Sequence, residues 1–498
     1  MNSHFRRKAH PDEDNAVIQM PTRTYARFDH LEADTAAHSV LLAFDLVDAQ
    51  WLDMEGQRNP LLNAEWPSNV ARAWNHWTQL PLDEAPDPFE AMPLYRLEFD
   101  LSDGQLLFNR HLPPAADLSA LRGAASELEW LWFEIEIHDD AQQGGMEALL
   151  YPGLFANPLP VYVKGQMPSL RKHQALSTIF SLAHLPTLST EQVQTELSHA
   201  TADLLAVFDV GQGNANALLS TTQYGEPGVP THYYDLGAGV YRNRHTTPDP
   251  LAFCFCDAPL ILLSHWDADH WAGTYAVTTN NAYPALRRKW IAPLQVVGPL
   301  HIAFAHDIIS NGGEIFIYSP SGKIGEATLS PQRRIRFMCG NGRDRNGTGI
   351  VLAVEEHEKE PRRSWLLTGD CDYLYFVNEL QPLPPVGMVV PHHGADLDRN
   401  SPIPRPPPGV DYKRLVYSYG PGNKHGRAPV QHPTYQGVAP HNSADWDHNR
   451  WTIMAPGYPA PGGDVLATCE HVPGTSRGCA LIGWDHPPRH LFPPCHGF

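Results

Sequence analysis

Apolar positions before residue 200 predict a different kind of structure from those after it. Strand-like or short helical pieces are separated here by turns rich in Pro, Asp and Gly, at residues 39–47, 95–101, 128–138 and 161–164. The second half of residues 128–138 alternates apolar and polar side chains, as a half-exposed strand does. We therefore expect residues 1–200 to form an α/β or β-rich accessory domain that begins with a polar tail.

After residue 200 the apolar runs become short and continuous. Residues 204–208 and 258–264 are typical of strands buried on both faces. Residues 185–201 predict a short linking helix, and a helix is expected to begin within residues 271–278. Further strand-like runs cover residues 295–297, 315–318, 335–338, 350–354, 364–367 and 387–390.

The chain has 498 residues, more than one hydrophobic core comfortably holds, so two domains or one domain with large additions are expected. We place the second domain at residues 201–440. Residues 441–498 are rich in Pro, Gly and His, show little periodicity, and form a C-terminal extension expected to pack on that domain. The 13 Trp and 42% hydrophobic content predict folded structure throughout.

The formal charge of −19, from 36 basic and 55 acidic residues, disfavours a protein that coats nucleic acid through a general basic surface. A local basic groove stays open, with candidate arginine clusters at 287–289, 333–336, 343–345 and 362–363. The first residues lack the apolar core of a signal peptide, and no run reaches the roughly 18 apolar residues that span a bilayer. Seven cysteines without a regular framework are typical of reduced thiols. We expect a cytoplasmic protein with no membrane insertion.

Candidate chemistry begins where the run 258–264 ends. His265, Asp267, Asp269 and His270 lie within six residues there. One such residue after a strand is usually part of a solvated turn. Four at this spacing favour a metal-binding loop, and the mixture of imidazole and carboxylate suits a pair of divalent ions better than a closed structural site.

This stretch resembles the His-x-His-x-Asp-His signature of the metallo-β-lactamase fold, in the variant with aspartate second that is typical of the hydrolase domain of ComEC-type DNA-uptake proteins. Other pieces of that pattern occur in the same order along the chain. Asp209-Val-Gly-Gln-Gly213 and Tyr234-Asp235-Leu-Gly237 lie upstream. Downstream are Leu366-Leu-Thr-Gly-Asp370, Val390-Pro-His-His-Gly394, and Ser418-x-Gly420 leading to His432-Pro433. The resemblance covers residues 203–440, close to half of the chain. It implies an α/β fold, an αββα sandwich with metals at one edge, without the membrane channel of the ComEC proteins.

The resemblance also implies a ligand set for two divalent ions, zinc or manganese. His265 and Asp267 would serve one ion, Asp269 and His270 the other, and Asp370 would bridge both. Carboxylates in place of imidazoles tilt the preference toward manganese. The third histidine that serves the first ion in many relatives has no counterpart, so that position is weaker, or is completed by His393 and water.

The last metal ligand is open between two residues. The family usually has a compact Asn-x-x-Gly-His-Pro run, whereas here Asn423 and His425 are separated from His432 by several residues. We favour His432 because Pro433 fits the start of a helix. Asn423 and His425 then become supporting or substrate-binding residues.

Other residues are assigned supporting roles. Asp209 and Asp235 are expected to support the ligands as buried carboxylates. Trp266 and Trp271 flank the loop and either stack on a base or pack in the core.

The predicted catalytic residues are Asp269, His392 and His393. In the pair His392 and His393, one ring would bind metal or substrate phosphate and the other would protonate the leaving group. The leading prediction is a metal-dependent hydrolase that cleaves phosphodiester bonds in nucleic acid or a nucleotide through a metal-bridging hydroxide.

Two alternatives remain. One is a two-metal hydrolase of a small ester, lactone or amide. The other is an inactive hydrolase domain that acts as a binding or regulatory module. A protein partner bound through the N-terminal domain is left open.

Overall fold

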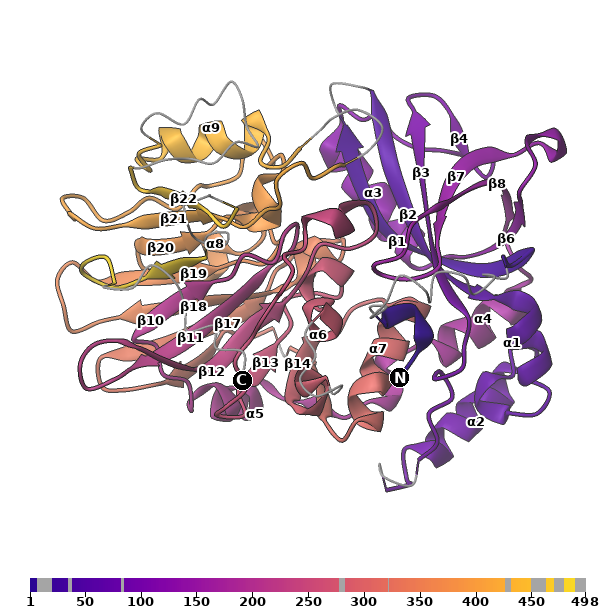
Figure 1. Cartoon of the computed structure of the whole chain (residues 1–498), viewed down its shortest axis with the longest axis horizontal. Coiled ribbons are helices and arrows are strands. Elements are labelled where there is room, and N and C mark those ends of the chain that lie inside the picture. Colours follow the sequence, from indigo (N-terminus) through magenta and orange to yellow (C-terminus); the bar gives the residue numbers. More distant parts are fainter. Residues whose placement is uncertain are drawn as a thin grey trace. The chain divides into compact units, whose positions relative to one another are not determined.

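The computed structural model describes residues 1–6, 20–34, 38–81, 85–276, 283–320, 322–425, 431–448, 463–469 and 479–488. Contacts divide the chain into two compact units (Figure 1). The barrel unit comprises Met1–Pro186, Val296–Ile315 and His425–Pro429, and the double-sheet unit comprises Thr187–Gln295, Phe316–Lys424 and Val430–Phe498. Two segments predicted within residues 201–440 therefore group with the N-terminal part.

Six strands of the barrel unit close into a barrel, in the order β1 (Arg23–Asp34), β2 (Ser39–Asp48), β3 (Leu94–Ser102), β7 (Met146–Tyr151), β8 (Leu159–Gln166) and β6 (Trp132–His138). All of these neighbours pair antiparallel. Inward side chains such as Phe44, Leu97 and Ile135 are fully buried in one core cluster. Closure leaves the sheet without open edges.

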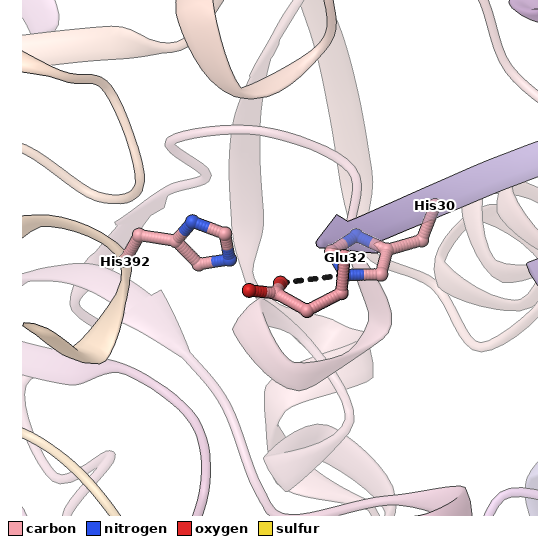
Figure 2. Close-up of side chains that lie close together, drawn as sticks. All are labelled: His30, Glu32 and His392. Atoms are coloured by element: carbon pink, nitrogen blue, oxygen red, sulfur yellow. Dashed lines mark ion pairs between the residues drawn. The ribbon is translucent and has the colours of Figure 1, made fainter. Parts of the chain in front are cut away.

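A bulge interrupts β1 between Phe28 and His30, where the register with β2 shifts. Beyond it, His30 and Glu32 stand two residues apart and therefore on the same face of the strand. Figure 2 shows them with the His30 Nε2 atom 3.4 Å from Glu32 Oε2. The bulge therefore re-aims this end of β1 and places an ion pair on it.

Five α-helices pack with the barrel: α1 (Ala49–Glu55), α2 (Pro67–Trp77), α3 (Leu118–Glu129), α4 (Leu170–Ile179) and α7 (Pro299–Ser310). Helix α7 is mostly apolar, packs against β2 and β3, and is buried at every residue except its last. Its polar residues His301, His306 and Asp307 are buried as well. The Asn2 backbone N–H donates to Asp307 on α7 at 3.0 Å, and Phe5 is fully buried. The polar tail predicted for residues 1 to about 30 is thus wrong for residues 1–6 and where β1 begins at Arg23, while residues 7–19 lie outside the described residues.

The double-sheet unit contains an eight-stranded and a seven-stranded sheet (Figure 1). The first has the order β23 (Ala480–Ile482), β10 (Leu204–Val207), β11 (Ala215–Thr221), β12 (Pro227–Leu236), β13 (Leu260–Leu262), β14 (Lys289–Pro293), β15 (Glu314–Tyr318), β9 (Thr187–Leu188). The second has the order β16 (Gly325–Thr328), β17 (Arg333–Cys339), β18 (Ile350–Glu356), β19 (Arg363–Leu367), β20 (Pro385–Val389), β21 (Arg414–Tyr417), β22 (Val465–Ala467).

The two sheets share one core. Leu205 and Leu262 from the first sheet cluster with Leu352 and Trp365 from the second. Alternate residues of the second sheet, such as Val351, face outward and pack under α8 (Val377–Leu380) and α9 (Tyr435–Ser443). The α/β class predicted from the sequence is confirmed by these mixed sheets and helices.

Most predicted elements of this unit lie on observed ones, including the linking helix, now α5 (Thr190–Leu197), which starts with a capping box at Ser189. The predicted strand at residues 295–297 is wrong, because β14 ends at Pro293 and the chain runs irregularly to Gly298 and α7. The C-terminal extension supplies β22 and β23, which complete one edge of each sheet. No helix in the described part of the chain combines the length and apolar character that crossing a membrane requires.

Candidate metal centre

The candidate site lies where several strands of both sheets end. Strands β12, β13 and β14 run parallel in one sheet, and β19, β20 and β21 run parallel in the other. Parallel strands bring their carboxyl ends to one edge, where ligand-binding loops are usually held. Asp235 lies at the end of β12, His265 follows β13, Asp370 follows β19, and His392 and His393 follow β20.

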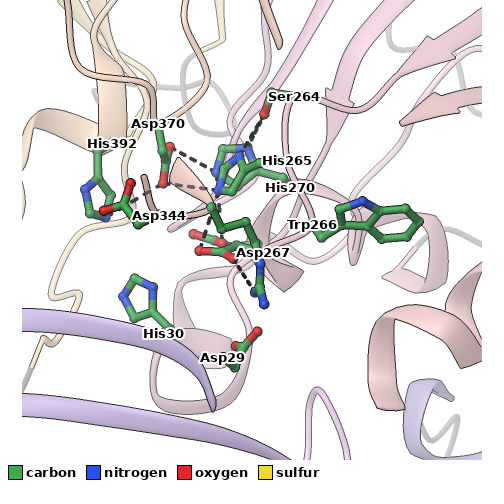
Figure 3. Close-up of polar contacts among 12 residues, drawn as sticks. Asp29, His30, Ser264, His265, Trp266, Asp267, His270, Asp344, Asp370 and His392 are labelled. Atoms are coloured by element: carbon green, nitrogen blue, oxygen red, sulfur yellow. Dashed lines mark hydrogen bonds and ion pairs between the residues drawn. The ribbon is translucent and has the colours of Figure 1, made fainter. Parts of the chain in front are cut away.

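Asp370 lies among four imidazole rings, two for each of its oxygens (Figure 3 labels His265, His270 and His392). Oδ1 lies 3.1 Å from His270 Nε2 and 3.9 Å from His393 Nε2. Oδ2 lies 3.6 Å from His265 Nε2 and 3.7 Å from His392 Nε2. One carboxylate thus faces two separate pairs of nitrogen donors, as a bridging ligand does.

The metal loop, residues 265–270, contains two aspartates, and each of them lies beside a different pair of nitrogen donors. Asp269 Oδ2 lies 3.2 Å from His393 Nε2, and its Oδ1 lies 4.0 Å from His270 Nε2. Asp267 Oδ2 lies 3.5 Å from His265 Nε2. Two groups able to hold an ion result: His265, His270 and Asp370, and Asp269, His270 and His393. Donors 3–4 Å apart fit ions that bind nitrogen and oxygen at about 2.1 Å.

Several of these donor atoms are buried without a hydrogen bond among the described residues. They are His265 Nε2, His270 Nε2 and Asp370 Oδ1. Buried polar atoms are nearly always satisfied, and those that are not usually await a ligand, water or ion. The residues present therefore fit a divalent metal.

The pKa values in the centre depend on how its imidazoles and carboxylates are paired. Burial by itself would lower the pKa of His270, but the charges of Asp370 and Asp235 hold it well above its usual range. Burial would raise the pKa of Asp370, yet the surrounding histidines, His270 first, hold it well below. Burial would raise the pKa of Asp269 too, but the hydrogen bond with His393 and the charges of His270 and His393 together lower it. In the absence of metal, the carboxylates are charged and His270 carries a proton.

Asp235 fixes the orientation of His270. It is fully buried, has φ 62°, and accepts hydrogen bonds from Ser264 N at 2.6 Å, Ser264 Oγ at 2.8 Å and Asn214 Nδ2 at 3.0 Å. Its Oδ2 also lies 2.8 Å from His270 Nδ1. This bond occupies Nδ1 and directs Nε2 toward Asp370, as outer carboxylates do for metal-bound histidines.

Gly237 explains the glycine of the Asp-x-Gly motif. A Cβ at this position would lie 1.9 Å from the backbone oxygen of Asp269. The metal loop therefore rests directly on the end of β12, and only glycine allows that approach.

The backbone holds His393 in place. Its Nδ1 donates to the carbonyl oxygen of Ser418 at 2.7 Å, which directs Nε2 toward Asp269 Oδ2 at 3.2 Å. His392 and His393 have positive φ values of 49° and 55°. This left-handed backbone is costly for residues other than glycine and turns the two rings in different directions.

Arg345 contacts the centre, which the sequence did not predict. Its Nη1 donates to Asp267 Oδ1 at 2.9 Å, and both residues are buried. The only signal in the sequence was its place in the turn before β18, where it precedes Asn346 and Gly347. Ser264 and Asn214, which hold Asp235, were also missed because single polar residues in apolar runs carry no motif.

His432 is placed beside His392 rather than in either donor group. Their ring centroids are 5.5 Å apart. Asn423 holds the His432 backbone, accepting from its N–H at 2.8 Å and donating to its carbonyl at 2.8 Å. The supporting role of Asn423 agrees with this geometry, while a ligand role for His432 stays a prediction. His425 groups with the barrel unit, so the choice between the two histidines also stays open.

The remaining predicted residues lie around the centre. Asp209 is buried and accepts from the Gly211 N–H at 3.1 Å, so it shapes the turn after β10. Trp266 and Trp271 are fully buried, and their indole N–H groups donate to backbone carbonyls of Pro293 and Trp266. Their burial favours packing over base stacking.

No protein-family model and no curated protein matches the chain. Among solved structures, zinc-bound PqqB from Methylobacterium extorquens matches with a TM-score of 0.19 and 10% identity, over 34% of this chain and 65% of PqqB. Rm3 metallo-β-lactamase matches with a TM-score of 0.18 and 14% identity, over 35% of this chain and 64% of its own. The chain thus spans slightly under two thirds of each structure. At these TM-scores, the interpretation of the site rests on its own geometry.

Proposed function

We propose that this protein is a metal-dependent hydrolase that cleaves phosphodiester bonds in a nucleotide or nucleic acid. The observation that carries the metal dependence is Asp370, with two ring nitrogens facing each of its oxygens. The order of motifs that resembles the ComEC-type hydrolase domain supports the phosphodiester substrate. Two divalent ions, zinc or manganese, would be held by His265, Asp267, Asp269, His270, His393 and Asp370.

Bound ions would supply an acidified water and polarise the oxygens of the scissile phosphate. The chain's own residues would orient the donors and handle protons. Asp235 keeps His270 aimed at the ions through its 2.8 Å contact with Nδ1. His392 is the most exposed of the four histidines, with 18% of its side chain accessible against 3% for His393. We therefore assign protonation of the leaving group to His392 and metal binding to His393.

The arginine clusters at 333–336 and 362–363 favour a small nucleotide over a long nucleic acid. Arg333 pairs with Asp203 and Glu356. Arg334 and Arg336 both pair with the buried Glu355. Arg363 pairs with Glu356 and Asp485. Guanidinium groups already neutralised in this way contribute little to a phosphate-binding groove.

A substrate screen tests the proposal. Protein purified without chelator would be supplied with Mn²⁺, Zn²⁺ or Mg²⁺ and offered linear and cyclic dinucleotides, single-stranded DNA, RNA, a lactone and a thioester. We expect cleavage of the dinucleotides, with weaker action on the polymers. Cleavage of the lactone or thioester alone would support the small-ester alternative, and binding of metal without any hydrolysis would support a regulatory module.

Two histidine variants separate the assigned roles. His392→Gln is expected to retain bound metal and lose activity most strongly with poor leaving groups, since those need a proton. His393→Gln is expected to lose bound metal. Equal metal loss in both variants would contradict the assignment of His392 as the proton donor.

A further inference from the structure

We propose that Arg345 makes the two halves of the metal centre unequal, so that the ion near His265 and Asp267 binds more weakly than the ion near Asp269, His270 and His393. This inference rests on the proposed function, because it requires that the centre binds divalent ions. It concerns a residue that the metal-binding motifs do not include. Arg345 acts through Asp267 and is therefore a positioning residue.

The carboxylate of Asp267 is shared between two groups. Its Oδ1 accepts a hydrogen bond from Arg345 Nη1 at 2.9 Å, while its Oδ2 faces His265 Nε2 at 3.5 Å. The side chains are 3% and 8% exposed for Arg345 and Asp267. A charge-assisted hydrogen bond in such a buried place is strong. An ion beside His265 would therefore meet a carboxylate whose charge is already partly neutralised.

The turn that carries Arg345 is tied to the metal loop. The carbonyl of Arg345 accepts from Gln295 Nε2 at 2.7 Å and from Thr348 Oγ1 at 3.2 Å. The N–H of Ile350, two residues after Thr348, donates to the carbonyl of Ser264 at 2.8 Å. Ser264 is the residue immediately before His265. These bonds hold the backbone of Arg345 beside the metal loop.

The other half of the centre contains no such cation. Among the residues that the structure describes, the side chains of Asp269 and Asp370 form ion pairs only with histidines. An imidazole nitrogen can act as a metal ligand, whereas a guanidinium offers no lone pair and stays charged at every accessible pH. An ion at Asp269, His270 and His393 would therefore face only potential ligands, while an ion at Asp267 would lie near a permanent positive charge.

Repulsion between a guanidinium and a divalent ion a few ångströms apart in a buried site lowers affinity by about tenfold or more. We therefore expect sequential filling. The first ion occupies the Asp269 half, and the second binds only at higher free metal concentration. The weaker position then controls how much metal the fully loaded protein needs.

The test is a metal titration of the full chain with Zn²⁺ and Mn²⁺, using equilibrium dialysis and elemental analysis, with Co²⁺ absorption as a second readout. Arg345→Gln retains an N–H donor for Asp267 but removes the charge, and should tighten the second dissociation constant by about tenfold or more. Arg345→Lys restores the charge and should restore the weak second site. Arg343→Gln, on the exposed Arg343 of the same loop, is the matched control and should leave both constants unchanged.

Two equal dissociation constants in the unaltered protein would overturn the inference and leave the proposed function standing. The inference also fails if Arg345→Gln weakens the second site, because Arg345 would then hold Asp267 in place for the ion. Absence of bound metal in every variant would instead overturn the proposed function.

Discussion

Buried histidines in the two units have pKa values that are shifted in opposite directions. In the barrel unit, His184 and His306 face each other with their Nε2 atoms 3.0 Å apart, and the Trp74 ring stacks on His184 at 4.0 Å. Burial lowers the pKa of His184 to about 3 and that of His306 well below its usual range. In the double-sheet unit, His270 is just as buried, yet its pKa is raised well above 6.5 by Asp370 and Asp235.

The difference lies in the neighbours, because burial penalises the charged form in both places. Aromatic rings pack on the His184–His306 pair, and burial there outweighs the Asp87 carboxylate, which lies 3.8 Å from His306 Nδ1. The carboxylates of Asp235 and Asp370 lie closer to the His270 nitrogens, at 2.8 and 3.1 Å, and keep His270 charged. A neutral pair in an apolar surrounding stabilises a core. A charged histidine can instead lie among carboxylates whose oxygen atoms are not all hydrogen-bonded. At such a site a metal ion can replace the proton.

The largest effect is expected from Asp370→Asn. The change removes the charge that faces all four histidines, so metal binding should be lost and activity should fall by at least about a hundredfold. Elemental analysis and the phosphodiester assay would measure both. Asp411→Asn, at an exposed position of the same unit, serves as control. Full metal content in Asp370→Asn would contradict the role of Asp370 as bridging ligand.

Asp235→Asn should have the next largest effect. Asn keeps the shape but loses the charge that orients His270 and raises its pKa, so metal affinity should fall by about 10–100-fold, as for other outer partners of metal ligands. Metal titration would detect the change, and circular dichroism would show whether the fold is retained. An unchanged affinity would mean that His270 is held by packing alone.

Acid should destabilise the barrel unit through His184 and His306. Their folded pKa values are lowered, so below pH 6.5 the unfolded chain takes up protons that the folded pair refuses. The stabilisation is complete above that pH and is lost as the pH falls toward 3. Between pH 7 and pH 5 the free energy of unfolding should drop by about 2 kcal/mol for each histidine.

Hydrogen exchange of α2 and α7 at several pH values would measure this loss locally. A His184→Phe, His306→Leu double variant should flatten the pH dependence, and His76→Gln, at an exposed position of α2, should not. The same slope in the double variant would show that other groups cause the acid sensitivity.

The smallest effect is expected from His432→Gln. Because His432 lies beside His392 and outside both donor groups, metal affinity should change by less than about tenfold, below the usual effect of an outer partner. A metal titration of this variant beside Asp370→Asn would decide the matter. Loss of one full equivalent of metal would show that the sequence motif, and not the donor geometry, identifies the last ligand.

The sequence predicted the parts of the fold that depend on local pattern. The buried runs before His265 and before Asp370 are strands, because a strand covered on both faces has to be apolar throughout. The metal loop and Asp370 could be assigned to one site only through the resemblance, because the strands that precede them belong to different sheets.

The features that the sequence did not predict depend on pairing between distant segments. Strands β22 and β23 come from a stretch with little periodicity and form because each sheet has an edge to fill. Helix α7 is mostly apolar and buries its few polar residues, so its sequence gives no sign that it packs with the barrel. Arg345 could not be recognised as a partner of Asp267, since 77 residues separate them in the chain.

The most direct test of the account is a crystal structure of protein purified without chelator, with anomalous scattering measured at the absorption edges of zinc and manganese. The account predicts an anomalous peak within bonding distance of Asp269, His270, His393 and Asp370, and a weaker peak beside His265. A structure without a peak among these residues, from crystals grown with the metal present, would contradict it.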